Sequence, residues 1–170
     1  MIRVVTWFAG FIVLSGCGVG VTRDESPLSD QERAAITEEM RGVMKEYSAA
    51  WSKITCQNQD AVLKFFDWSG PGVIDGNETT VTEYPGDAWP TLIRNAACSN
   101  EGEEAGIDTL LVRVFTRDIV TVHWTFHAKY IQKEGPPKLA QGAVMQLFRR
   151  TPDGWKTPVG MSTHQPMSAK

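Results

Sequence analysis

The sequence is poor in the features that mark metal sites and nucleic-acid interfaces. Its 170 residues include only three cysteines and three histidines, and these show neither a CxxC nor an HExxH spacing. We therefore expect neither a metal site nor a cofactor. The 17 basic residues are outnumbered by 20 acidic ones and form no stripe along the chain, so nucleic acid is not an expected partner.

A long apolar run is also missing. The apolar segment from Val4 to Leu14 is far shorter than the roughly 20 residues that a membrane-spanning helix needs. It follows one basic residue, Arg3, and precedes small residues, which is the pattern of a secretory signal. The sequence therefore predicts export without a spanning helix.

Residues 14–17, with the sequence LSGC, end this segment. They resemble the lipobox of bacterial lipoproteins, in which a diacylglycerol is attached to the cysteine and the chain is cut just before it. The resemblance implies a signal peptide over 1–16, a lipid on Cys17, and a protein held on the periplasmic or cell-surface side of a bacterial membrane. Acyl chains contribute about 0.8 kcal/mol per buried methylene, so several chains on one cysteine anchor a domain. An ordinary secretory signal that contains a cysteine is the alternative.

Two cysteines remain, Cys56 and Cys98. In an exported domain disulfides persist, so the two are expected to pair. The chain-entropy description gives a loop of this length roughly 4 kcal/mol of stabilisation. Two buried free thiols are the alternative.

The rest of the chain indicates one domain behind a tether. Residues 17–28 mix glycine, serine, proline and charges, as a flexible tether does. The domain is expected over 29–166, with a tail at 167–170. Ser29 and Glu32 form a capping box, and apolar spacing predicts helices over 30–54, 57–67 and 87–98.

After an acidic loop at 99–106, alternating apolar and polar residues predict strands. The expected strands cover 111–116, 119–131, 139–150 and 155–164. Helices followed by a meander of strands are typical of an α+β domain with helices on one side of an antiparallel sheet.

The segment GAVMQLFRRTPDGWKTPVGMS, residues 142–162, together with FFD and GDAWPTLI earlier in the chain, resembles the NTF2-like superfamily. The similarity is to its SnoaL-like and DUF4440-type members. It implies a cone in which three N-terminal helices pack on a curved antiparallel sheet around a pocket, and a homodimer joined through the outer sheet face. Members commonly carry a histidine near the end of the last strand. This chain has Val159, Gly160 and Met161 before Ser162, so that histidine is not expected.

The ketosteroid isomerase branch of the superfamily suggests candidate catalytic residues. That chemistry needs a tyrosine on the first helix, an acid on a strand and a carboxylate base. Tyr47 and Asp75 match the tyrosine and the base, while Gln146 stands where the acid is expected. A core role for Tyr47 and a turn role for Asp75 are the alternative.

The remaining candidates are histidines and aromatic residues. His123 and His127 share a strand face but stand about 13 Å apart, too far for one metal ion, so we expect them on the surface or at a dimer face. His164 is expected to be exposed and without function. Aromatic walls are usual in ligand pockets, and the candidates for lining one are Tyr84, Trp89, Trp124 and Tyr130. Core packing is the alternative for each of them.

Three functions fit this sequence. The first is a tethered module that binds a small apolar or aromatic ligand with Tyr47, Gln146 and the four aromatic residues. The second is an isomerase or hydrolase that uses Tyr47 and Asp75. The third is a homodimeric assembly module that meets its partner through the sheet face. We favour the ligand-binding module, because no complete catalytic set is visible and a fold alone does not define chemistry.

Overall fold

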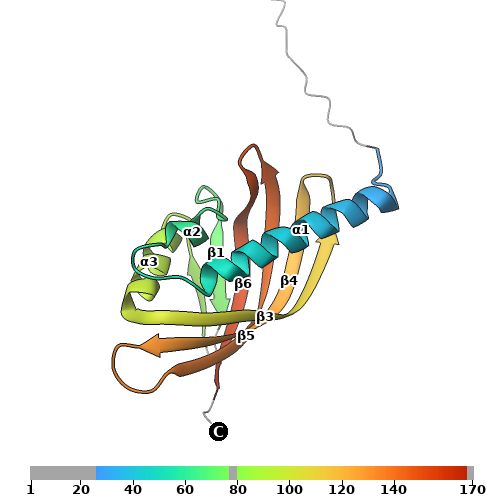
Figure 1. Ribbon diagram of the computed structural model, residues 1–170. Helices are drawn as coiled ribbons and strands as arrows, with labels where there is room; N and C mark the ends of the chain where they lie inside the picture. The colour runs from blue at the N-terminus through green and yellow to red at the C-terminus, as the bar shows by residue number, and fades with distance from the viewer. Residues whose placement is uncertain (1–25, 77–79, 168–170) are drawn as a thin grey trace, which may run out of the picture.

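The computed structural model describes residues 26–76 and 80–167. Its helices are α1 (Asp30–Trp51), α2 (Asp60–Leu63) and α3 (Trp89–Ser99). Its six strands are β1 (Gly72–Gly76), β2 (Val81–Tyr84), β3 (Asn100–Val114), β4 (Ile119–Gln132), β5 (Lys138–Thr151) and β6 (Gly154–Met167). Figure 1 shows α1 lying across one face of the curved sheet, with α2 and α3 at one end. The α+β cone is confirmed.

Helix α1 begins as its capping box predicts. The Ser29 amide donates to Glu32 Oε2 at 2.8 Å, and the Glu32 amide donates to Ser29 Oγ at 3.2 Å, so two free backbone donors of the first turn are satisfied. The buried face of α1 carries Ile36, Met40, Met44 and Tyr47. These side chains pack on the sheet and form the core with it.

The strands form one sheet in the order β2-β1-β6-β5-β4-β3. The four long strands are antiparallel neighbours, but β1 pairs with β6 in parallel. The expectation of a wholly antiparallel sheet is therefore wrong at this pair. Strands β1 and β2 are five and four residues long, too short to show an alternating pattern. Pairing with the distant β6 defines β1, and pairing with β1 defines β2.

Residues 99–106 form no acidic loop. Most of this segment is the first half of β3, where Glu103 pairs with Tyr130 of β4 and Ala105 with Ala128. Glycine and acidic residues have low strand propensity, but the long partner strand β4 supplies backbone hydrogen bonds that override it. This pairing puts Glu103 and Tyr130 on the same face of the sheet.

We call the face against α1 the inner face and the opposite one the outer face. Alternation along β4 puts Val120, Val122 and Trp124 on the inner face, where they are buried. The largest completely buried side chains come from both layers: Phe148, Met40, Met44, Val62, Val120 and Val122.

Cys56, between α1 and α2, forms a disulfide with Cys98 in α3, and the two Cα atoms are 4.5 Å apart. The bond fastens the α2 end of the domain to α3. None of the helices within 26–76 and 80–167 is long and apolar enough to cross a membrane. The predicted signal peptide and Cys17 lie outside the described residues.

Candidate functional site

Tyr47 and Trp124 form an aromatic floor on the inner face of the sheet. The two rings are 5.8 Å apart at their centroids and packed edge to face, and each residue is 6% exposed. Burial raises the pKa of Tyr47 to about 12, while hydrogen bonds with the Trp51 and Gln146 side chains act in the opposite direction. The phenol is therefore a neutral hydrogen-bonding group.

Gln146 of β5 lies beside this floor and is 4% exposed. Its neighbour across the β5–β6 pair is Gly160, where a Cβ atom would lie 2.8 Å from Gln146 Cγ, so the glycine leaves the room that the glutamine occupies. Gln146 Oε1 is buried and has no hydrogen-bond partner within the described part of the chain. A buried acceptor without a partner costs about 1–3 kcal/mol, so this oxygen can accept a further hydrogen bond.

Asp75, Ser162 and His164 form a polar group at the rim of the inner face. Ser162 Oγ donates to Asp75 Oδ1 at 2.7 Å, and His164 Nδ1 lies 2.9 Å from the same oxygen. The side chains of Asp75 and His164 are 28% and 39% exposed. The parallel pairing of β1 with β6 brings them together, because Asp75 is in register with Ser162.

Two expectations change at this rim. Asp75 lies in strand β1 rather than in a turn. His164 lies in strand β6 and is a hydrogen-bond partner of Asp75, rather than an exposed residue of the tail. The His164 ring also contacts Phe126 at a centroid distance of 5.3 Å. The sequence signal that could have found the histidine was its place two residues after Ser162, on the same face of the last strand.

The Asp75–His164 pair has the geometry of an oriented imidazole. A proton on Nδ1 directed at the carboxylate leaves Nε2 free to accept a proton or a hydrogen bond. Ser162 bonds to the aspartate and not to the histidine, so this is no serine nucleophile with a histidine base. Tyr47 and Asp75, the candidate catalytic pair, have different hydrogen-bond partners in the structure.

Glu103 and Tyr130 occupy the β3–β4 side of the same face. Burial raises the pKa of Glu103 to about 7. It also raises the pKa of Tyr130 to about 12, with further contributions from the negative charges of Glu103 and Asp75. Strand β4 is three steps from β1 in the sheet order, about 14 Å along a flat sheet. The influence of Asp75 on Tyr130 is thus consistent with a sheet that curls around the inner face.

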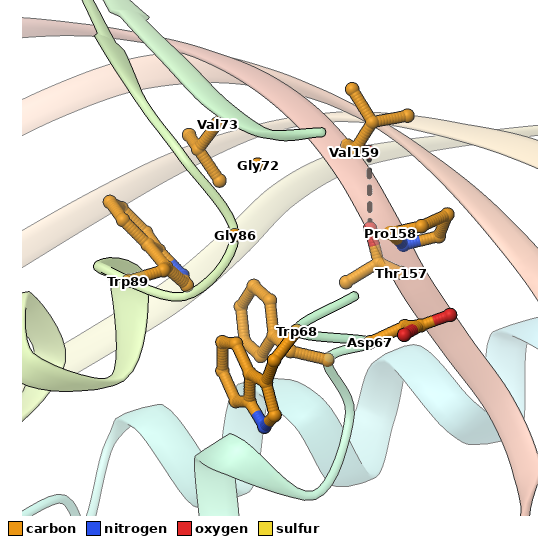
Figure 2. Close-up of a pocket in the computed structure, with 10 residues that line it drawn as sticks. Asp67, Trp68, Gly72, Val73, Gly86, Trp89, Thr157, Pro158 and Val159 are labelled. Atoms are coloured by element: carbon orange, nitrogen blue, oxygen red, sulfur yellow. Dashed lines mark hydrogen bonds between the residues drawn. The ribbon is translucent and has the colours of Figure 1, made fainter. Parts of the chain in front are cut away.

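Tyr84 and Trp89 lie in a second aromatic cluster with Phe66 and Trp68. Phe66 stacks on Trp68 at 5.1 Å, and Trp89 lies 6.3 Å from Phe66 and 5.9 Å from Tyr84. Figure 2 shows the cavity beside Trp68 and Trp89. Its volume is about 10 Å³, space for about one water molecule. This cavity is too small for a ring ligand.

The outer face carries a shallow groove of about 450 Å³. Leu111, Met145 and Met161 are 52%, 41% and 44% exposed there. His123 lines the groove and lies 3.2 Å from Thr121 Oγ1, whereas His127 Nδ1 lies 2.6 Å from Asp108. No group of three potential metal-binding side chains occurs within the two described ranges.

No protein-family model matches the sequence, and no curated protein matches it significantly. Solved structures do match the chain. An NTF2-like superfamily protein from Salmonella enterica has a TM-score of 0.60 at 9% identity, over 81% of this chain and 95% of that one. A protein described as a candidate scytalone dehydratase, from Novosphingobium aromaticivorans, has a TM-score of 0.63 at 10% identity, over 82% and 89%.

A hexachlorocyclohexane dehydrochlorinase has a TM-score of 0.57 at 13% identity, over 84% of this chain and 95% of that one. At such low identities these likenesses concern the fold and not the activity. The order of elements, the curved sheet and these structural neighbours agree: the chain has the fold of the NTF2-like superfamily.

Proposed function

We propose that this protein is an exported, lipid-anchored module that binds a small apolar or aromatic molecule on the inner face of its sheet. The observation that carries the proposal is Gln146 Oε1, a buried acceptor beside the aromatic floor of Tyr47 and Trp124 that has no hydrogen-bond partner within residues 26–76 and 80–167. Apolar walls with a few polar groups are the usual composition of small-molecule sites. The lipobox resemblance of residues 14–17 supports the anchor on Cys17.

Native mass spectrometry of the protein extracted from its own membrane tests both parts. We expect the lipid mass on Cys17 and a retained small molecule. Gln146→Leu removes the polar contact and should release that molecule, whereas the outer-face control Met145→Leu should keep it. A parent chain that carries no small molecule, and that no ring compound stabilises against heat, would contradict the binding function.

Cys17→Ser should free the domain from the membrane fraction, and a variant that stays there would contradict the anchor.

A second candidate is a lyase-type enzyme, favoured by the Asp75–His164 contact at 2.9 Å. Dehydratases and dehydrochlorinases, the activities named for two structural neighbours, remove a proton and a leaving group from adjacent atoms. An oriented imidazole is a suitable base for the proton. This candidate replaces the expected pairing of Tyr47 with Asp75 by a pairing of His164 with Asp75.

A third role concerns the outer face, and it is compatible with either of the others. The exposed Leu111, Met145 and Met161 suit a homodimer joined across the sheet, because a symmetric contact puts the same patch of both subunits together. We propose this dimer as the state in which the module works.

A further inference from the structure

The turn between β3 and β4, residues 115–118, presents an apolar ring to solvent. Phe115 at its start is 59% exposed. The turn is fixed by the backbone, because the Phe115 amide donates to Ile119 O at 3.0 Å. The Arg150 amide of the neighbouring β5 donates to Asp118 O at 2.9 Å. The hairpin therefore holds a phenyl ring outward at its tip.

The first described residues of the chain lie beside this turn. Arg117 Nη1 donates to Ser26 O at 3.1 Å, and Arg117 Nη2 lies 3.4 Å from Ser26 Oγ. Arg33 of α1 donates to the O atom of Val114, the residue before Phe115, at 2.8 Å. Figure 1 shows the start of α1 at the end of the domain away from α3. The chain thus enters the domain next to the exposed ring.

The proposed lipid would bring this end of the domain to a membrane. Ser26 lies nine residues after Cys17, and a chain of that length spans at most about 30 Å. A lipid on Cys17 therefore keeps the β3–β4 turn close to the bilayer, whatever path the chain takes between the two residues.

We propose that the β3–β4 turn rests in the membrane surface, with the Phe115 ring inserted between the lipid headgroups. Aromatic rings favour this interfacial layer. The inference rests on the lipid anchor proposed above and adds an orientation to it. The rim with Asp75 and His164 lies toward the far end of β6 from its turn with β5, so the proposed ligand site would open away from the bilayer.

The charges at this end of the domain are compatible with an anionic surface. Most of the carboxylates beside the turn are held in ion pairs within the protein: Glu32–Arg117, Glu39–Arg150 and Asp118–Arg150. Arg33 and Arg113 are exposed and have no carboxylate partner within 26–76 and 80–167. Asp30 is the exposed acid that faces solvent near them. The charge left unpaired is therefore one positive unit in excess, which anionic lipid attracts.

Fluorescence quenching tests this membrane contact in the acylated protein, reconstituted in vesicles of phosphatidylethanolamine and phosphatidylglycerol. Thr116→Cys puts a thiol-linked label on the exposed residue next to Phe115, and the disulfide keeps Cys56 and Cys98 from reacting. A nitroxide carried by the lipid should quench this label, and iodide in the water should not. Val81→Cys is the matched control, because Val81 is 77% exposed on the opposite edge strand β2. Its label should be quenched by iodide alone.

Two further substitutions in the Thr116→Cys chain test the ring itself. Phe115→Ser should remove most of the quenching by lipid. Leu111→Ser removes another exposed apolar side chain of β3 and should leave the quenching unchanged. Unchanged quenching in Phe115→Ser would overturn the insertion of the ring.

The remaining outcomes separate the membrane contact from the anchor. A label on residue 116 that iodide reaches, in protein with the lipid mass on Cys17, would overturn the contact while the anchor survives. A label shielded from both quenchers would also overturn it, because a second copy of the chain would then cover the turn. Absence of the lipid from Cys17 would contradict the anchor and the membrane contact together.

Discussion

The two faces of the sheet carry side chains in opposite kinds of unfavourable environment. The inner face holds polar groups in apolar surroundings: Gln146 Oε1 is buried and has no hydrogen-bond partner among the described residues, and burial raises the pKa of the partly buried Glu103. The outer face exposes apolar groups, Met145 and Met161 among them. Buried polar groups and exposed apolar surface are each unfavourable for an isolated domain. This difference is what the two proposed roles require, in which a small ligand satisfies the inner face and a second copy of the chain covers the outer one.

The two faces should differ most in how far the truncation of a side chain lowers the free energy of unfolding. Trp124→Ala removes a buried ring that packs on Tyr47, and such a change costs about 3–5 kcal/mol. On the neighbouring strand β5, Met145→Ala truncates a side chain that is 41% exposed and should cost less than about 1 kcal/mol in the monomer. Urea unfolding measures both free energies. Equal losses of unfolding free energy would show that the two faces are not distinct environments.

The sequence predicted the long elements better than the site. The capping box located the start of α1, and alternation over 119–131 predicted β4 to within one residue, because these signals are local. Strand β1 depends on pairing with the distant β6, edge strand β2 depends on β1, and the first half of β3 depends on the far half of β4, and no local pattern shows these pairings. The Asp75–His164 contact was missed for the same reason, since it needs the parallel register of β1 with β6.

Gln146 shows the opposite case. The resemblance to the ketosteroid isomerase branch put Gln146 in the place of the acid that acts with the tyrosine, and in the structure its side chain interacts with Tyr47. What the sequence could not supply was the lack of a partner for its oxygen, because that depends on the packing of every neighbouring element. Glu103 was missed because its glycine-rich and acidic surroundings indicate a loop.

A second contrast is between a partly buried carboxyl group on β3, Glu103, and an exposed one, Glu104. Glu103 has a folded-state pKa of about 7, above the ordinary value of 4.5, so the folded protein binds this proton more tightly than the unfolded chain does. Stability is therefore lost as the pH rises from about 4.5 to about 7. Glu103→Gln should abolish that loss and raise the free energy of unfolding at pH 8 by up to about 3 kcal/mol, with little change at pH 4.

Urea unfolding at several pH values between 4 and 8 measures this difference. Glu104→Gln should give a nearly flat difference, because the Glu104 side chain is 62% exposed and pairs with Lys129 at the surface. If Glu103→Gln changed stability equally at pH 4 and pH 8, the carboxyl would be acting through packing rather than through its proton.

The smallest effect on the stability of the domain, but a large one on assembly, should come from Thr125→Glu on the outer face. Thr125 lines the groove and its hydroxyl lies 2.6 Å from that of Thr109, so a glutamate there introduces a charge into the proposed dimer contact. Near a two-fold axis the two copies of that charge would face each other, with a desolvation cost where the face is buried. The parent should sediment as a dimer and the variant as a monomer, with the free energy of unfolding of the monomer changed by about 0.5 kcal/mol or less.

Thr91→Glu makes the same substitution at an exposed site of α3 and should leave the dimer intact. A parent that is monomeric at working concentration would remove the assembly role, and the exposed methionines would then need a different partner to cover them.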